Sequence, residues 1–181
     1  MILPNSLIRK FNALGVLGLG LVLGIGLVMQ VALDELPCPL CLLQRVAFAL
    51  VMYGFMLNVI CGLKFRHYGI IVLGTLYGAG VSLRQISLHV VPGTGTYGSS
   101  IFGLHLYTWA FVLFAATLLA VAVLLLFSHP HKQYEPVVTT KMERFICWGA
   151  VIMVALNMAS TFLECGPLVC DDNPTTYRLL P

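Results

Sequence analysis

The chain has 181 residues, of which 59% are hydrophobic and only 9% are charged, and its mean hydropathy is +0.94. These few charged and polar side chains cannot cover the surface of a water-soluble domain of this size. The composition therefore excludes an ordinary soluble domain and predicts an integral membrane protein. The net charge of +3 does not indicate a nucleic-acid partner, because the basic residues form short clusters between apolar runs.

Five apolar stretches, each of roughly 20 residues, are long enough to cross the hydrocarbon core as helices. In chain order they cover residues 11–33, 42–62, 69–91, 105–127 and 145–163. The first ends in acidic residues rather than in a small-residue cleavage site, so we interpret it as a retained span. We expect one all-α integral membrane domain over 1–181, with a four-helix core (1–128), a cytoplasmic loop (129–144), a fifth span (145–163) and a periplasmic tail (164–181).

The distribution of lysine and arginine predicts the orientation of the spans. Seven of the ten basic residues fall on one side, namely Arg9, Lys10, Lys64, Arg66, Lys132, Lys141 and Arg144. Cytoplasmic loops carry an excess of such residues. The N-terminus is therefore expected in the cytoplasm and the C-terminus on the outer, periplasmic side of a bacterial inner membrane.

The same orientation divides the six cysteines into two groups. Four are expected on the oxidising outer side, as the pairs Cys38/Cys41 and Cys165/Cys170. Cys61 and Cys147 fall near the cytoplasmic ends of their spans, where thiols stay reduced, and we interpret them as small buried hydrophobic residues.

The segment "DELPCPLCLLQR" (34–45) has the features of a reactive dithiol. Cys41 lies at the start of the second span, where unpaired backbone N–H groups and the helix dipole favour a thiolate, and Arg45 follows one turn later on the same face. Pro37 and Pro39 keep the approach extended. An arginine at the edge of an apolar span also suggests a functional site. A lipid-soluble, oxygen-bearing electron acceptor would suit it.

Less reactive roles are possible for the same residues. Arg45 alone could be an interfacial anchor, and the C-x-x-C motif could be a structural disulfide or part of a metal site shared with Cys165 and Cys170. The tail pair could be a structural staple. His129 and His131 could be written as a metal pair, but without a third ligand they are more typical of a solvated linker.

The motif "CPLCLLQR" in a helical membrane protein resembles the DsbB family, the thiol:quinone oxidoreductases of the bacterial inner membrane. The resemblance extends over spans one to four, with a second match in "YGAGVSLRQISLH", where Tyr77, Ala79 and His89 fall at similar spacings. It implies a four-helix bundle that binds a quinone at its outer end, and this quinone would be ubiquinone or menaquinone.

The resemblance also implies roles for individual residues. Cys41 would face the quinone, Arg45 would stabilise the negative charge formed there, and Cys38 would exchange disulfides with the second pair. Three further side chains would help to hold the quinone oxygens: His89, with Arg84 and Gln85 as weaker candidates.

One departure from the family pattern changes the expected electron path. Family members usually carry the second cysteine pair in the outer loop between spans three and four, but residues 91–104 contain no cysteine. A fifth span instead delivers Cys165 and Cys170 to the same side. We expect electrons to pass from a periplasmic thioredoxin-like (DsbA-type) protein to Cys165/Cys170, then to Cys38/Cys41, then to quinone.

The predicted function is therefore a thiol:quinone oxidoreductase that supports disulfide bond formation. Two alternatives remain open from the sequence. The first is the reverse reaction, a reductant of outer-side disulfides, because the direction depends on the stabilisation of each redox form. The second is a non-catalytic assembly or metal-handling membrane subunit.

Overall fold

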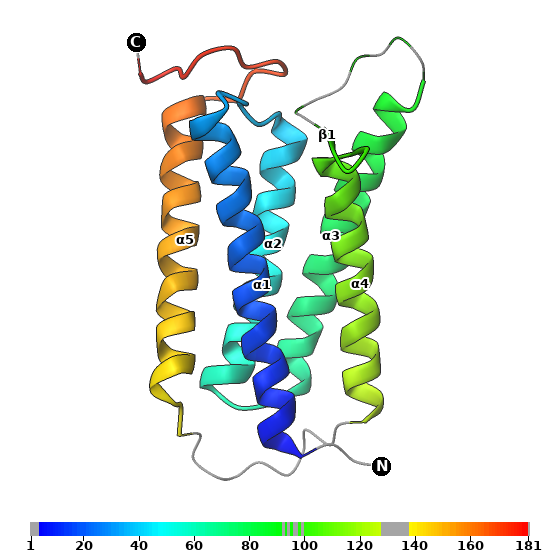
Figure 1. Cartoon of the computed structure of the whole chain (residues 1–181), viewed down its shortest axis with the longest axis vertical. Coiled ribbons are helices and arrows are strands. Elements are labelled where there is room, and N and C mark those ends of the chain that lie inside the picture. Colours follow the sequence, from blue (N-terminus) through cyan, green and yellow to red (C-terminus); the bar gives the residue numbers. More distant parts are fainter. Residues whose placement is uncertain are drawn as a thin grey trace.

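A computed structural model describes residues 4–91, 93, 95, 98, 100–127 and 138–180. These residues form five long helices and one hairpin: α1 (Asn5–Ala32), α2 (Pro39–Ile60), α3 (Phe65–His89), β1 (Ser100–Ile101), β2 (Leu104–His105), α4 (Leu106–Leu126) and α5 (Lys141–Cys165) (Figure 1). Each of the five helices is long and apolar enough to cross a membrane. The predicted all-α membrane fold is confirmed, and every predicted span overlaps one helix.

Two helix starts are fixed by local hydrogen bonds. At α2, Cys38 is the N-cap and its sulfur accepts a hydrogen bond from the backbone N–H of Cys41 (3.2 Å), while Pro39 occupies the first turn, where no N–H partner is needed. At α5, Thr140 and Glu143 form a reciprocal capping box. The first of these caps places both sulfurs of the C-x-x-C motif at the end of a helix.

The helices form a bundle in which α2 contacts each of the other four. It packs against α1 and α3 and, over a smaller surface, against α5; α3 packs against α4, and α5 packs mainly against α1. In Figure 1, α5 therefore stands beside α1, on the opposite side of the bundle from α3 and α4. The rings of Phe48 and Phe114 stack at 4.1 Å between centroids and join α2 to α4 in the core.

Consecutive helices run in opposite directions, which brings distant segments to the same end. The start of α2, the hairpin before α4 and the tail after α5 all lie at the upper end in Figure 1, and the N-terminus lies at the lower end. The pairs Cys38/Cys41 and Cys165/Cys170 thus share one end of the bundle, as the count of spans predicted.

A buried polar network holds the lower ends of the first three helices together. The Asn12 side chain donates to the Tyr68 hydroxyl (3.1 Å), and the Asn58 side chain donates to the side-chain oxygen Oδ1 of Asn12 (2.8 Å). His67 Nδ1 lies 3.1 Å from the side-chain oxygen Oδ1 of Asn58. In lipid, hydrogen bonds between helices are one of the few forces that favour their association. Arg9 adds a salt bridge to Glu143 (2.9 Å), which ties α1 to the start of α5.

Helices α3 and α4 approach each other closely at Gly78. A methyl group at this position would overlap the ring of Phe114, whereas one at Gly80, half a turn away, would meet no atom within 4 Å. Gly78 therefore permits the contact between the two helices, in the way small residues do in membrane bundles.

We predict that Gly78→Ala destabilises the protein by about 1–3 kcal/mol, because the added methyl group overpacks the contact with Phe114. Thermal unfolding of the purified protein in detergent would measure the loss. Gly80→Ala is the matched control, with an expected stability equal to or above that of the natural chain. Equal stability of both variants would contradict the proposed contact.

Candidate functional site

The C-x-x-C sulfurs occupy two different environments at the start of α2. Both cysteines are free thiols; Cys38 is buried, with 4% of its surface exposed, and Cys41 is half-buried. A hydrogen bond with the side chain of Cys41, together with burial, raises the pKa of the Cys38 thiol above its ordinary value. Cys38 is therefore held as the protonated thiol of the pair, which leaves Cys41 as the candidate thiolate.

A buried glutamine from α3 contacts both sulfurs. Gln85, which has no exposed surface, points its side-chain amide nitrogen at the sulfur of Cys38 (3.1 Å) and at that of Cys41 (3.3 Å). Gln44 donates to the carbonyl oxygen of Gln85 (2.8 Å) and so fixes which end of the amide faces the sulfurs. An N–H donor directed at sulfur stabilises its anionic form. Gln85 thus belongs to the site.

Arg45 lies on the other side of α2 and is held by α1. Its guanidinium donates to the side-chain oxygen of Gln30 (2.7 Å) and to the backbone carbonyl of Gly26 (2.9 Å). A Cβ atom at position 26 would lie 3.5 Å from the guanidinium, an ordinary van der Waals contact, so this approach does not depend on a glycine. An interfacial anchor would instead direct its charge to the membrane surface. The geometry favours the functional interpretation of Arg45.

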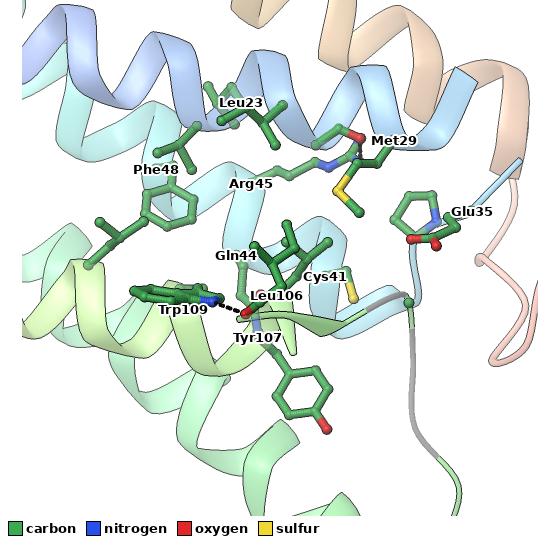
Figure 2. Close-up of a pocket in the computed structure, with 18 of the residues that line it drawn as sticks. Leu23, Met29, Glu35, Cys41, Gln44, Arg45, Phe48, Leu106, Tyr107 and Trp109 are labelled. Atoms are coloured by element: carbon green, nitrogen blue, oxygen red, sulfur yellow. Dashed lines mark hydrogen bonds between the residues drawn. The ribbon is translucent and has the colours of Figure 1, made fainter. Parts of the chain in front are cut away.

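A cavity of about 380 Å³ opens beside these residues, a volume typical of small-ligand sites. Figure 2 shows Arg45 and Cys41 on the α2 side and Trp109 and Tyr107 on the α4 side. The rest of the lining is largely apolar and includes Leu23, Met29, Phe48, Leu106 and Leu113. Trp109 donates to the carbonyl of Ile101 (2.9 Å) and ties the hairpin to α4 at the mouth of the cavity. The shape and chemistry suit a flat, lipid-soluble molecule with oxygen acceptors.

Three side chains were predicted to help hold such a ligand, and the structure places each of them in a different environment. Gln85 lies against the sulfurs, as described. His89 Nδ1 lies 3.0 Å from the carbonyl oxygen of Gly95, and its ring is 5.7 Å from that of Tyr107. Arg84 is exposed. None of the three lines the cavity, so the role of Gln85, His89 and Arg84 as quinone ligands stays a prediction without support from this geometry.

The second cysteine pair is joined in a disulfide at the end of α5. Cys165 and Cys170 have Cα atoms 4.6 Å apart, and Gly166 makes the turn between them with a φ of 65°. Cys165 is buried, with 5% of its surface exposed, whereas Cys170 is half-buried. Arg178 donates to the carbonyl of Cys165 (3.1 Å), so the tail folds back over the helix end.

The remaining cysteine and histidine predictions have separate outcomes. Cys147 is buried, as predicted; Cys61 is exposed, so the prediction of a buried residue is wrong there, because Cys61 caps the end of α2 beyond its packed surface. Within the described part of the chain, no group of three or more histidine, cysteine or acidic residues could hold a metal ion. His129 and His131 lie outside the described residues.

Sequence reasoning missed three polar residues of this site: Gln30, Gln44 and Glu164. Gln30 links Arg45 to Glu164, because its amide nitrogen donates to the Glu164 carboxylate (3.1 Å). All three are buried within apolar spans. Their polarity at membrane depth was a signal that could have identified them, since such residues usually face the interior of a bundle.

Comparison with known proteins gives a partial match. Residues 8–96 match the family described as "Disulfide bond formation protein DsbB". Disulfide bond formation protein B of Chromohalobacter salexigens is 31% identical over 95 residues, which cover 50% of this chain and 55% of that protein. The protein of the same name from Chromobacterium violaceum is 40% identical over 75 residues, which cover 39% of this chain and 45% of that protein. No solved structure matches.

The chain spans about half the length of these curated relatives. The family match ends at residue 96, before α4, whereas the sequence resemblance was expected to continue through the fourth span. The matched segment contains Cys38, Cys41, Arg45 and Gln85, and α4 and α5 lie outside it.

We predict that Gln85→Leu slows alkylation of Cys41 by iodoacetamide at neutral pH. The loss of a hydrogen bond to a charged group costs about 1.5–3 kcal/mol, so the rate should fall roughly 10-fold or more. Peptide mass spectrometry after timed alkylation would report the rate for Cys41 alone. Ser87→Ala, at an exposed position on the same helix, is the control. An unchanged rate in Gln85→Leu would show that the amide does not support the thiolate.

Proposed function

We propose that this chain, which matches the DsbB family of disulfide bond formation proteins over residues 8–96, is a membrane thiol:quinone oxidoreductase. In this proposal it reoxidises a periplasmic thioredoxin-like (DsbA-type) dithiol protein and passes the electrons to quinone. The observation that carries the proposal is the arrangement of Cys41 and Arg45 on the wall of one apolar cavity. The protein is a multi-pass membrane protein. We propose that it lies in the bacterial inner membrane and that the end of the bundle with the four cysteines Cys38, Cys41, Cys165 and Cys170 faces the periplasm.

The cavity residues fit a quinone. The apolar walls of the cavity would hold the quinone ring, while Arg45 and Gln44 are the polar side chains on the α2 wall. Quinone supplies a lipid-soluble acceptor for two electrons and two protons. Arg45 would stabilise negative charge at the sulfur and at the acceptor oxygens, and the buried Cys38 would remain protonated until the disulfide forms.

The tail disulfide is the proposed entry point for electrons. Cys170 is the more exposed of the two sulfurs, so we infer that the partner's thiolate attacks Cys170 and that Cys165 leaves. Resolution of the mixed disulfide by the partner's second thiol then leaves Cys165 and Cys170 reduced. Exchange with the Cys38–Cys41 disulfide returns them to the oxidised form, with Cys38 as the sulfur that is attacked.

The test of this function is quinone reduction by the purified protein, and Arg45 provides the sharpest variant. The natural chain should reduce a soluble quinone analogue with electrons from a reduced thioredoxin-like protein. We predict that Arg45→Ala lowers this rate on the order of 10²-fold, because one preorganised charge donor is lost. Arg45→Lys should recover only part of it, since a point charge cannot replace the planar guanidinium.

The control for this experiment is Arg66→Ala, which removes an exposed arginine at the opposite end of the bundle. It should leave the rate unchanged. If Arg45→Ala reduced quinone as fast as the natural chain, Arg45 would be an interfacial anchor. If the natural chain reduced no quinone at all, the proposed function would be wrong.

The tail provides a separate prediction. Cys165→Ser and Cys170→Ser should each abolish oxidation of the protein partner, yet leave quinone reduction from a small dithiol, which can reach Cys38 and Cys41 directly. Two parallel assays, one with each electron donor, would measure this difference. A structural staple would show another pattern: lower stability or yield, with normal partner oxidation in the molecules that fold.

A further inference from the structure

Glu164 is a buried carboxyl group that the proposed electron path does not use. It lies in the last turn of α5, next to Cys165, and 4% of its surface is exposed. Its Oε2 accepts a hydrogen bond from Gln30 (3.1 Å), and its Oε1 is buried without a hydrogen-bond partner among the described residues. A buried, half-satisfied carboxylate is costly, so its charge needs compensation from nearby.

The nearest compensation is Arg45, connected through one amide. Gln30 has no exposed surface; its oxygen accepts from Arg45 (2.7 Å) while its nitrogen donates to Glu164. The amide dipole is thus aligned between a cation and an acid. This chain of hydrogen bonds joins α2, α1 and α5 across the end of the bundle.

Two acidic groups share this one cation. Glu164 is linked to Arg45 through Gln30, and Cys41 lies one turn before Arg45 on α2 and shares the cavity wall with it. Tyr177 is the titratable group of the tail near Arg45. Arg178, a cation of the tail, donates its backbone N–H to the backbone carbonyl of Glu164 and pairs its side chain with Asp171. A thiolate at Cys41 and a carboxylate at Glu164 together would leave one negative charge uncompensated in a site of low dielectric.

The number of charges in the site changes with its redox state. When Cys38 and Cys41 form a disulfide, Cys41 carries no charge, and the Glu164 carboxylate is the anion that balances Arg45. When the pair is reduced, the Cys41 thiolate lies beside Arg45 and competes with the carboxylate. Interacting groups of this kind titrate as a unit, so the gain of one negative charge favours protonation of the other group.

Resting on the function proposed above, we propose that Glu164 is a redox-linked proton acceptor, which binds a proton when the Cys38–Cys41 disulfide is reduced and releases it when the disulfide re-forms. In the reduction, an incoming dithiol supplies two electrons and the S–S bond breaks. Cys38 binds one proton, Cys41 remains a thiolate, and Glu164 binds the second proton. The reverse step releases two electrons and two protons, the numbers that reduction of a quinone to a quinol requires.

The reduced site in the structure agrees with this assignment. Cys38 and Cys41 are free thiols, and the unpartnered Oε1 of Glu164 is tolerated more easily on a neutral carboxyl than on a carboxylate. Glu164 touches neither the cavity nor the sulfurs, so it acts through Gln30 and Arg45 as a positioning and charge-balancing residue.

The test is the redox equilibrium of the Cys38–Cys41 pair with glutathione as a function of pH. Two glutathione thiols release two protons on oxidation, and the natural chain takes up two, so its equilibrium constant should be independent of pH across the neutral range. The Glu164→Gln variant takes up only one proton. Its equilibrium constant for reduction by glutathione should therefore increase about tenfold for each unit by which the pH is raised. Differential alkylation with peptide mass spectrometry reads this pair separately from Cys165 and Cys170.

Matched variants make the result specific. Glu164→Asp, which keeps the acid, should remain independent of pH. Glu143→Gln removes the other buried glutamate of α5, which pairs with Arg9 at the opposite end, and should behave as the natural chain. A tenfold rise per pH unit in the natural chain or in Glu143→Gln, or the same flat response in Glu164→Gln, would overturn the proposal.

A second measurement covers the case in which Glu164→Gln does not fold. Infrared difference spectra of the natural chain, reduced minus oxidised, should contain the carbonyl band of a newly protonated carboxyl group, and Glu164→Asp should shift that band. Its absence would overturn the proposal. Quinone reduction by the same preparation tests the proposed function separately, because turnover without proton uptake at Glu164 would reject only this inference.

Discussion

The hydrogen bonds of Arg45 constrain the whole sulfur-bearing end of the bundle. A guanidinium near the end of an apolar helix cannot leave its donors unpaired, and here α1 provides the carbonyl of Gly26 and the side chain of Gln30. Gln30 in turn draws Glu164 and the end of α5 to the same place. Satisfying one cation thus orders three helices, and the rest of the guanidinium is left facing the cavity. Stability of the helix ends and the chemistry proposed for the site therefore depend on the same contacts.

The two sulfurs lie between this cation and an amide from the opposite side. Gln85 on α3 directs its nitrogen at both sulfur atoms, and the N-cap position of Cys38 fixes the sulfurs relative to the first turn of α2. Arg45 is carried by the same helix one turn later. The environment is therefore asymmetric: Cys38 is the more buried residue, and Cys41 is the one that lies one turn before Arg45 on the same helix. Such an asymmetry separates the roles of two chemically identical thiols, since one is kept protonated and the other is available as a nucleophile.

Local sequence features were sufficient to predict the spans, the end of the bundle that carries both cysteine pairs, and the placing of Arg45 after Cys41. Each of these depends on hydrophobic length or on spacing within one helix. Gln30 and Glu164 were not predicted as a pair because they are 134 residues apart, and no periodicity relates α1 to α5. Arg84 and Gln85 were grouped as candidates, but adjacent residues on a helix point about 100° apart, so only one of them can face the sulfurs. His89 shares the face of Gln85 but lies one turn further on, beyond the level of the sulfurs, where it meets Gly95 and Tyr107.

The position of α5 separates the two reactions proposed for this protein. Although α5 follows α4 in the chain, it packs against α1, and its ends are fixed there by Arg9 to Glu143 and by Gln30 to Glu164. The tail disulfide therefore approaches the end of the bundle from the α1 side, while the cavity is closed by α4 and its hairpin and receives no side chain from the described part of α5 or the tail. Thiol exchange with a protein would then occur on the α5 side of the bundle, and electron transfer to a lipid-soluble acceptor on the α4 side. Because the helix that carries Glu164 also carries Cys165, the residue proposed to balance the charge of the C-x-x-C pair is covalently adjacent to the cysteine pair that, in its dithiol form, would pass electrons to Cys38 and Cys41.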